Sequence, residues 1–244
     1  MSTTALITGG TSGIGRAVAK KLAQLGVHVL VVGRNVDRGQ KTIAEIRAAG
    51  GQADFISSDL QDASSAREVA RRAVELGNGN VDILVNNAGT YPFGPTHEMS
   101  EELFDKVFSL NVKVPYFLVA ELAPLMAKTG KGAIVNVSTM VADYGASGVS
   151  LYGSSKAAIN LLTKAWTAEY GGSGVRINAV SPGPTRTEGT DSMGEGLDQL
   201  ASEAPAGRPA TSDEIAEAIV FLATERASFI QGANLAVDGG RTAV

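Results

Sequence analysis

Short apolar runs recur along the chain, and longer segments with helical spacing lie between them. The runs are rich in Val, Ile and Leu and show no polar alternation, which is typical of strands buried on both faces, as in a parallel sheet. They occupy residues 5–7, 27–32, 53–56, 81–85, 133–137, 175–180 and 234–237. The pattern therefore predicts seven buried strands.

The segments between the runs repeat apolar residues every three or four positions, as amphipathic helices do. In the first, apolar residues from Ile14 to Leu25 would share one helix face, and Gly26 could end the helix. The other predicted helices cover residues 36–49, 63–76, 101–128, 154–170 and 211–224. Strand and helix alternate throughout, which predicts one α/β domain over residues 1–244. We expect a Rossmann-type doubly wound fold, with a seven-stranded parallel sheet and helices on both faces.

The segment 185–207 breaks this alternation. It holds four glycines, several Ser and Thr, and five acids but only one arginine, without clear periodicity. A segment of about 20 residues without periodicity in a compact domain is usually either a functional lid or disordered. We therefore expect a substrate lid around residues 185–207.

Composition narrows the possible functions. Glycine supplies 29 of 244 residues, well above its usual share of about 7%, so a compact fold needs many positions without side chains. The absence of cysteine excludes a thiolate nucleophile and Cys-ligated metal, and His28 and His97 are too few for catalytic zinc, so we expect no metal. The net charge of −4, without a basic run, argues against a nucleic-acid partner.

No targeting or membrane-spanning segment is expected. Residues 1–7 lack the positive region and the apolar stretch of a signal peptide, and no run of 18 apolar residues follows. This predicts a cytoplasmic location without a membrane partner.

A glycine-rich turn, Thr8-Gly9-Gly10-Thr11-Ser12-Gly13-Ile14-Gly15, separates the first predicted strand from the first predicted helix. Three glycines at this spacing would arise about 0.4 times by chance in such a composition, so the context carries the signal. Between a strand and a helix, backbone N–H groups and the positive helix end can meet a pyrophosphate. A turn without a ligand is the alternative. The predicted dinucleotide contacts here are Gly9, Thr11, Ser12, Gly13, Ile14 and Gly15.

The end of the second predicted strand indicates which dinucleotide is bound. Many NAD sites place an acid there to hold the ribose 2′-hydroxyl, but this strand ends in Gly33-Arg34-Asn35. A guanidinium at this position can pair with a 2′-phosphate. We therefore expect NADP(H), although Arg34 could also be a solvated residue at a strand end.

Candidate catalytic residues also follow predicted strands or begin a helix. Tyr152 and Lys156 lie four residues apart at a helix start, Ser138 follows the fifth strand, and Asn87-Ala88-Gly89 follows the fourth. Ligands of open parallel sheets bind beyond the carboxyl ends of the strands. Reduction of a carbonyl by hydride requires a proton donor, and a nearby lysine would lower the pKa of a tyrosine from its ordinary value near ~10 by about two units. Ser138 would donate to the substrate oxygen. The alternative is a half-buried tyrosine and a surface lysine.

These motifs together resemble the short-chain dehydrogenase/reductase family in its classical, NADP(H)-preferring form. The resemblance covers the whole chain and rests on the glycine-rich turn, Asn86 to Gly89, Asn111, Ser138, Tyr152 with Lys156, Pro182-Gly183 and Asp238-Gly239-Gly240. It implies that Asn111 holds a water in a proton relay from Lys156, whose amine binds the nicotinamide ribose. Asn111 inside a helix could instead satisfy the backbone.

The resemblance also extends the expected cofactor contacts. It implies that Asp59 contacts adenine, that Asn87 lies near the adenine ribose, and that residues 182–187 line the nicotinamide, although Asp59 could instead cap a helix. Ser12 stands where NADP-preferring members often have a second basic residue. The expected contacts beyond the glycine-rich turn are Arg34, Asn35, Asp59, Leu60, Asn87, Ala88, Gly89, Lys156, Pro182, Gly183, Thr185 and Thr187.

The leading functional hypothesis is an NADP(H)-dependent ketone reductase or alcohol dehydrogenase acting on a small, largely apolar carbonyl compound or secondary alcohol. Candidate pocket residues, each of which could equally be core or lid packing, are Tyr91, Phe93, Met140, Tyr144 and Met193. A second hypothesis is a 3-oxoacyl-(acyl-carrier-protein) reductase. Its acidic partner would be repelled by the acids of the lid. The resemblance places the docking arginines of such reductases at Thr129 and Ser173 of this chain, with Lys128 and Lys131 as partial substitutes.

A third hypothesis, more remote, is a non-catalytic NADP(H)-sensing protein. Such a protein would be expected to have lost Tyr152 or Lys156, and this chain retains both.

The segments 103–125 and 154–170 are apolar on more than one side, so they need a second packing partner. The resemblance makes that partner another subunit, and we expect a homotetramer.

Overall fold

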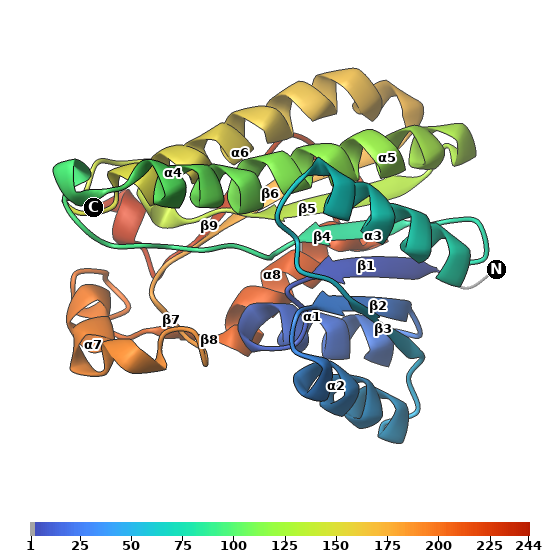
Figure 1. Cartoon of the computed structure of the whole chain (residues 1–244), viewed down its shortest axis with the longest axis horizontal. Helices are drawn as coiled ribbons and strands as arrows, with labels where there is room; N and C mark the ends of the chain where they lie inside the picture. Colours follow the sequence, from blue (N-terminus) through green and yellow to red (C-terminus); the bar gives the residue numbers. More distant parts are fainter. Residues whose placement is uncertain (1–2) are drawn as a thin grey trace.

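The computed structural model describes residues 3–244, and its centre is a seven-stranded parallel sheet (Figure 1). The strand order is β3-β2-β1-β4-β5-β6-β9, and every neighbouring pair is parallel. The strands are β1 Thr4–Thr8, β2 His28–Gly33, β3 Ala53–Ser57, β4 Ile83–Asn86, β5 Gly132–Val137, β6 Val175–Pro182 and β9 Asn234–Val237. All seven predicted strands are present, so the predicted fold class is confirmed.

Helices cover both faces of the sheet, as Figure 1 shows, and each face has its own apolar core. One face packs against α1 Gly13–Gln24, α2 Val36–Ala48 and α8 Ser212–Ala223. The other packs against α3 Ala63–Leu76, α5 Val114–Thr129 and α6 Ser150–Tyr170, with α4 Glu101–Phe108 leading into α5. The strand order reverses between β1 and β4, and the crevice at such a switch point is where open α/β sheets bind ligands.

Three predicted segments differ from the structure. The predicted helix 101–128 contains a π-helical turn, Ser109–Lys113, between α4 and α5. The predicted helix 154–170 begins four residues earlier, at Ser150. The segment 185–207, expected to lack regular structure, contains β7 Thr185–Arg186 and α7 Glu195–Ser202, and β7 pairs with β8 Ala210–Thr211. An eight-residue helix with only Leu197 and Ala201 buried is too short to give a clear period.

The continuous helical segment Glu101–Thr129 is long and apolar enough, by length and composition alone, to span a membrane, since an 18-residue window within it has a mean hydropathy of 1.2. In this structure its α5 portion packs into the core beside α3. Leu118, Leu122 and Met126 are each no more than 1% exposed and contact the same cluster as the strands. Its apolar composition is therefore accounted for by its position against the sheet.

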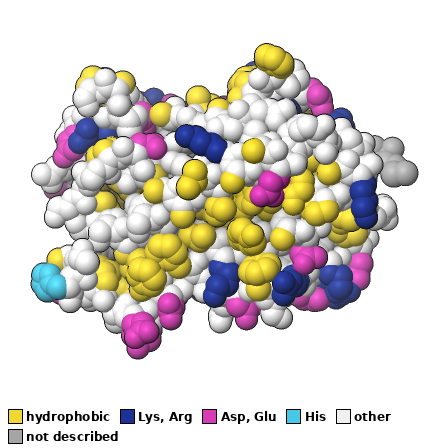
Figure 2. All heavy atoms as spheres, turned by 90° about the horizontal axis from the view of Figure 1, so that it is seen from above, with side chains coloured by type: hydrophobic (Ala, Val, Ile, Leu, Met, Phe, Trp, Pro, Cys, Tyr) yellow, Lys and Arg dark blue, Asp and Glu magenta, His cyan; other side chains and the backbone are white. Residues whose placement is uncertain are grey.

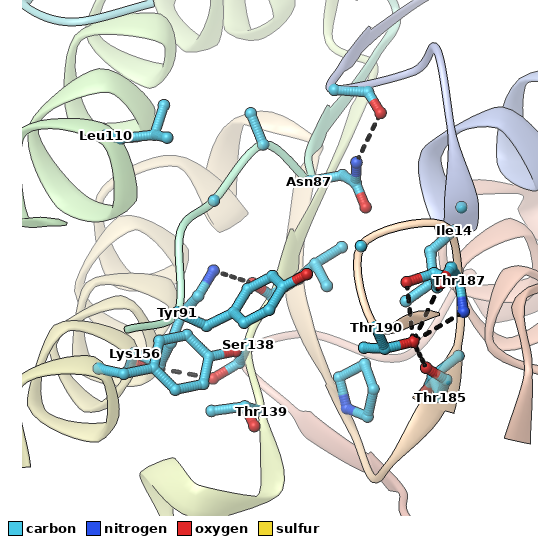
Figure 3. A pocket seen from close by; sticks show the side chains of 18 of the residues that line it. Ile14, Asn87, Tyr91, Leu110, Ser138, Thr139, Lys156, Thr185, Thr187 and Thr190 are labelled. Atoms are coloured by element: carbon cyan, nitrogen blue, oxygen red, sulfur yellow. Dashed lines mark hydrogen bonds between the residues drawn. The ribbon is translucent and has the colours of Figure 1, made fainter. Parts of the chain in front are cut away.

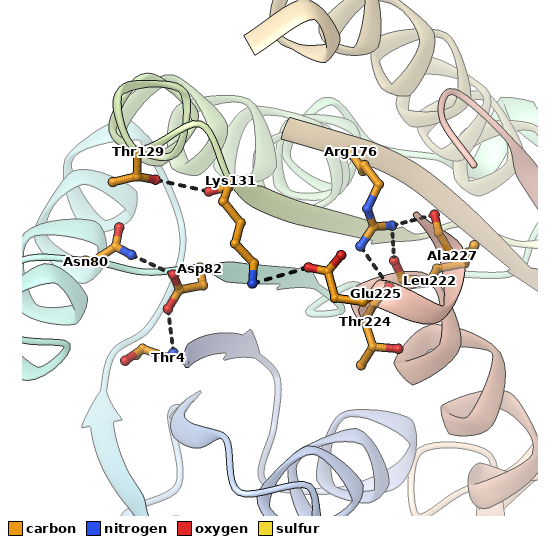
Figure 4. A network of polar contacts seen from close by, with 10 residues as sticks. All are labelled: Thr4, Asn80, Asp82, Thr129, Lys131, Arg176, Leu222, Thr224, Glu225 and Ala227. Atoms are coloured by element: carbon orange, nitrogen blue, oxygen red, sulfur yellow. Dashed lines mark hydrogen bonds and ion pairs between the residues drawn. The ribbon is translucent and has the colours of Figure 1, made fainter. Parts of the chain in front are cut away.

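The amino ends of the strands are closed by polar contacts (Figure 4). The Arg176 guanidinium on β6 is buried and donates hydrogen bonds to the carbonyls of Leu222, Thr224 and Ala227 at 2.7–3.1 Å. These carbonyls end α8 and begin the turn after it, where a helix leaves acceptors without partners. Arg176 therefore attaches α8 to the sheet, at the end of β6 farthest from Pro182.

Replacing Arg176 with Met should lower the free energy of unfolding by about 3 kcal/mol, because three buried carbonyls lose a charged donor. The melting temperature should fall by roughly 6–12 °C for a chain of this size. Thermal and urea unfolding of Arg176→Met measure this. The control is Arg72→Met on the exposed face of α3, for which a change within about 0.5 kcal/mol is expected. Equal stability of the two variants would contradict the anchoring role.

Candidate active site

One cavity of about 1080 Å³ runs along the carboxyl ends of the central strands. It is lined by all the predicted contact residues except Gly15 and Asn111. Figure 3 shows its two sides: Tyr91, Ser138, Thr139 and Lys156 lie together on one side, and Ile14, Asn87, Thr185, Thr187 and Thr190 on the other. The sequence motifs from distant segments therefore converge on a single site.

The glycine-rich turn passes so close to neighbouring backbone that a side chain would not fit. A Cβ atom at Gly15 would lie 2.4 Å from the Gly9 carbonyl oxygen and 2.5 Å from Asn87 Nδ2. Gly9 also has a φ of +64°, in the left-handed region that favours glycine. Gly15 thus acts by allowing α1 to begin against the turn, which is why it does not line the cavity.

Thr8 and Asn87 hold this turn to the loop after β4. Asn87 Nδ2 donates to the Thr8 and Gly9 carbonyls at 2.9 and 3.1 Å, and the Thr8 hydroxyl accepts from the Asn87 and Ala88 amides at 3.0 Å. The Asn87 amide group is therefore a structural link across the switch point. Thr8 was not among the predicted contacts, although its position just before the turn could have indicated it.

The basic end of the cavity lies at β2. Arg34 and Asn35 line it, and the Arg34 guanidinium is mostly exposed, with Nε 3.6 Å from Asp59 Oδ1. Asn35 Oδ1 accepts from the Arg38 amide at 2.8 Å and so caps α2. Arg38 lines the same part of the cavity. Arg38 was not predicted, because NADP-preferring members of the family often have their second basic residue at the position of Ser12.

The catalytic candidates meet where β5 and α6 approach each other. Lys156 is 5% exposed, its Nζ donates to the Val137 carbonyl at 2.8 Å, and burial lowers its pKa to about 8. Tyr152 lies one helical turn earlier and lines the cavity. Burial raises the pKa of Tyr152 to about 12, which an interaction with the Thr139 side chain only partly offsets. The Ser138 hydroxyl also lines the cavity, 3.4 Å from the Lys156 carbonyl.

The pKa of Tyr152 is raised, whereas the sequence led us to expect a lowered value. A lysine beside the phenol was expected to lower that pKa, whereas here the ammonium of Lys156 is held by a backbone carbonyl and the phenol is buried. Desolvation disfavours the phenolate and outweighs the other contributions. Burial therefore keeps Tyr152 protonated and able to donate a proton.

Asn111 lies within the π-helical turn between α4 and α5 and is fully buried. Its Nδ2 donates to the Thr90 carbonyl at 2.8 Å and to Ser155 Oγ at 3.0 Å, and its Oδ1 accepts from the Thr90 amide at 2.9 Å. The Ser155 hydroxyl in turn donates to the Tyr152 carbonyl at 2.7 Å. The Asn111 side chain thus connects the loop after β4 to the first turns of α6. Thr90 and Ser155 were not predicted.

The part of the cavity around Tyr152 carries apolar and aromatic side chains. The rings of Tyr91 and Tyr152 meet edge to face, with centroids 6.1 Å apart. Phe93, Met140, Tyr144 and Met193 complete the set of predicted pocket residues, and all five line the cavity. The Arg241 guanidinium also packs over the Tyr144 ring, with its central carbon 5.1 Å from the ring centroid. Arg241 was not predicted.

The segment after β6 is fixed over the glycine-rich turn. Glu188 Oε2 accepts from the Gly13 amide at 2.8 Å, and Glu188 Oε1 lies 2.7 Å from Arg16 Nη2. The Thr190 hydroxyl bonds the carbonyls of Thr185 and Thr187, which keeps this stretch compact. Glu188 thereby attaches the start of the expected lid to the amino end of α1. Only the structure reveals this contact, because the two residues are 175 positions apart.

Known proteins are similar in sequence to this chain over nearly its full length. A family model described as Enoyl-(Acyl carrier protein) reductase matches residues 9–242. An uncharacterized oxidoreductase of Thermotoga maritima is 39% identical, over 98% of this chain and 97% of that one. The 2,5-dichloro-2,5-cyclohexadiene-1,4-diol dehydrogenase of Sphingobium indicum is 36% identical, over 97% and 94%. A 3-oxoacyl-(acyl-carrier-protein) reductase of Thermotoga maritima is 35% identical, over 96% of each chain.

Solved structures match as well. A short chain dehydrogenase/reductase family protein is 45% identical, with a TM-score of 0.92 over 99% of this chain and 98% of that chain. A protein of Beutenbergia cavernae, assigned as an NAD(P)-dependent gluconate 5-dehydrogenase and solved with NADP at low occupancy, is 37% identical, with a TM-score of 0.93 over 99% and 97%. Fold and site together define an oxidoreductase of the class that uses a nicotinamide cofactor. The chain belongs to the short-chain dehydrogenase/reductase family.

Proposed function

We propose that this protein is an NADP(H)-dependent enzyme that interconverts a carbonyl compound and a secondary alcohol, with Tyr152 as general acid and base. The observation that carries the proposal is the single cavity that joins Ser138, Tyr152 and Lys156 to the glycine-rich turn. A proton donor and a dinucleotide cradle in one cavity are what hydride transfer to a carbonyl requires.

The cradle fits a dinucleotide. The closest approach of the turn, at Gly9 and Gly15, leaves no room for side chains, and the turn opens onto the amino end of α1. Thr8 and Asn87 hold it rigid, and Thr187 and Arg34 lie at other points along the same cavity. When bound, the nicotinamide supplies or accepts the hydride, which is chemistry that no side chain of this chain provides.

The side chains around Tyr152 manage the proton. The phenol donates to the developing alkoxide during reduction and removes the proton during oxidation. Ser138 donates a hydrogen bond to the same oxygen and so favours negative charge there. Lys156 supplies positive charge beside the phenol once a ligand draws its ammonium from the Val137 carbonyl. The Asn111 and Ser155 side chains hold the first turns of α6 in place, so they position Tyr152.

The preference for NADP(H) rests on two guanidinium groups. Arg34 and Arg38 line the cavity at the end of β2, where a ribose 2′-substituent is expected, and Asp59 already pairs with Arg34. Two cations beside one carboxylate leave net positive charge for a phosphate. The gluconate 5-dehydrogenase relative with NADP bound supports the same choice.

Replacing Arg34 with Asp should lower kcat/KM for NADPH by about 10- to 100-fold, because a charge-assisted contact to the 2′-phosphate is lost. The value for NADH should stay within about threefold, since NADH has no such phosphate. Steady-state kinetics with both cofactors measure this, and Arg72→Asp on exposed α3 controls for net charge. A wild-type preference for NADH would refute the cofactor assignment.

The substrate is a small carbonyl compound with a largely apolar body, because Phe93, Met140 and Met193 line the pocket beside Tyr152. NADPH oxidation with a panel of ketones, diketones and acetoacetyl thioesters tests this. Turnover restricted to the thioesters would favour a 3-oxoacyl-(acyl-carrier-protein) reductase, the name of one relative. Tight NADPH binding without turnover of any compound would favour a sensor.

The assembly we propose is a cytoplasmic homotetramer built on the helical face seen in Figure 2, where apolar side chains gather over α4, α5 and α6. Phe104, Tyr116 and Leu161 on these helices are 46–69% exposed. An apolar band of this kind on a helix face requires a covering partner. Gel filtration showing a monomer would contradict this assembly.

A further inference from the structure

Arg241 places a guanidinium in the wall of the substrate side of the cavity. It lines the cavity together with Tyr144, Leu197 and Leu200. Its guanidinium carbon lies 5.1 Å from the centre of the Tyr144 ring, and its side chain is 25% exposed. Its neighbours in this part of the wall are apolar or aromatic apart from Glu203, and a charge in such a region is costly unless an anion accompanies it.

The turn before Arg241 is built to hold it there. Gly239 and Gly240 both have left-handed φ values, and the Asp238 carboxylate accepts from the Gly240 and Thr242 amides at 2.9 Å. Burial opposes the charged form of Asp238, but these bonds and one from the Thr242 hydroxyl keep its pKa below the ordinary value. The Ala206 amide also donates to the Gly239 carbonyl, which joins the turn to the chain just after α7. Both Asp238 oxygens are thus occupied.

The partner of Arg241 is exchangeable. Glu203 Oε2 accepts from Arg241 Nη2 at 2.9 Å, and the Glu203 side chain is 55% exposed. Because the Glu203 end of the pair is more than half exposed, its carboxylate can return to solvent at little cost. Within residues 3–244 this is the one hydrogen bond made by the guanidinium, although an arginine can offer five N–H donors. A second carboxylate could therefore bind in the bidentate manner that arginine favours.

The cofactor does not need this group, because Arg34, directly after β2, and Arg38, on the first turn of α2, lie on other segments than Arg241. We propose that Arg241 binds a carboxylate of the substrate, so that the natural substrates are oxo acids and hydroxy acids with an apolar body between their two polar groups. In the free enzyme the Glu203 carboxylate stands in for that of the substrate. This inference rests on the proposed function, since it names the substrate class of the same site.

The test compares oxo acids with their methyl esters, which keep the ketone but lose the charge. Suitable acids, in order of increasing separation between the carboxylate and the ketone, are 4-oxopentanoate, 4-oxocyclohexanecarboxylate and 6-oxoheptanoate. For at least one length the acid should exceed its ester in kcat/KM by about 10- to 100-fold in the wild type. Arg241→Gln should abolish that preference while leaving the rate with the ester within about threefold, and Arg241→Lys should keep part of it.

The matched control is Arg226→Gln, because Arg226 also packs over an aromatic ring, that of Phe221 at 5.4 Å, but does not line the cavity. Its acid preference should equal that of the wild type. Three results would overturn the proposal: no acid preference at any length, a preference that survives Arg241→Gln, or an equal loss for acids and esters. The last would mean that Arg241 only holds α7 in place. Loss confined to acetoacetyl-coenzyme A would also overturn it, because the anion recognised would then be a phosphate.

Direct binding separates this inference from the proposed reaction. Calorimetric titration of the NADP⁺-saturated protein with cyclohexanecarboxylate, which has no carbonyl to reduce, should give binding that Arg241→Gln weakens about 10-fold or more. Methyl cyclohexanecarboxylate, which has neither the charge nor an alcohol to oxidise, should bind the two proteins equally. If no ketone were turned over but this difference held, the proposed reaction would fail and the carboxylate site would stand. Equal binding of cyclohexanecarboxylate to both proteins would remove the site even from an active enzyme.

Discussion

Tyr152→Phe should reduce kcat/KM for ketone reduction by about 10²–10⁴-fold, the usual contribution of a positioned general acid. The phenylalanine ring keeps the edge-to-face contact with Tyr91 but has no proton to give. The dissociation constant for NADPH should stay within about twofold, because the glycine-rich turn and the β2 end are untouched. Steady-state kinetics and a fluorescence titration of NADPH measure the two quantities.

The matched control is Tyr170→Phe, at the other end of the same helix α6 and outside the cavity. It should keep full activity. Substantial turnover by Tyr152→Phe would remove the phenol from the mechanism and move the proton source to another group. Loss of NADPH binding together with activity would instead indicate that the ring supports the cavity wall.

The pH profile should identify the same two groups. Tyr152, with a pKa raised to about 12 by burial, stays protonated over the working range and can donate during reduction. Lys156, with a pKa lowered to about 8, loses its positive charge as the pH rises through that value. Reduction that depends on this charge should therefore fall above pH 8, whereas alcohol oxidation, which needs the phenol deprotonated, should rise with pH. Reduction that is independent of pH between 6 and 10 would contradict this assignment.

The second large effect is expected from Gly15→Ala. The added methyl group would lie 2.4 Å from the Gly9 carbonyl oxygen and 2.5 Å from Asn87 Nδ2, and the first of these is backbone that cannot rotate away. The turn must shift, and its link to Asn87 must break. The dissociation constant for NADPH should rise by about 100-fold or more, equivalent to a loss of about 2.7 kcal/mol or more.

Gly172→Ala serves as the control, because a Cβ there meets nothing within 4 Å. Its NADPH affinity should match that of the wild type, and both variants should be checked for folding by far-ultraviolet circular dichroism. An NADPH affinity for Gly15→Ala close to the wild-type value would mean that the close approach of α1 to the turn does not shape the binding site.

The sequence predicts the strands well because the central strands are buried on both faces, so apolar residues fill most of their positions. The glycine-rich turn and the Tyr152–Lys156 pair are also visible, because each depends on local spacing. The helix α7 was missed, since Leu197 and Ala201 are its only buried residues. The π-helical turn at Asn111 was missed for a different reason: the segment 103–125 is apolar on more than one side, so a shift in helical phase leaves no visible break in its pattern.

What the sequence could not predict are contacts between side chains that are distant along the chain. Glu188 on Gly13, Arg241 on Glu203 and Asn111 on Ser155 each depend on where the turns end in space. No local pattern marks these residues, because exposed Glu and Arg are common on any surface. Arg38 could have been predicted, because the sequence already indicates a helix from residue 36 and so places Arg38 on its first turn, close to Arg34.

The strand β6 joins two regions with different selective demands. Its first residues carry Arg176, which anchors α8, and it ends at Pro182, beside the reacting groups. All eight of its residues are buried, so both of its ends are fixed by packing. Arg176 and Pro182 lie at opposite ends of β6, so a substitution at the cavity end can leave the contacts of Arg176 in place. Because the residues that anchor α8 and those that line the cavity are different, the cavity can change in evolution while the anchor is kept.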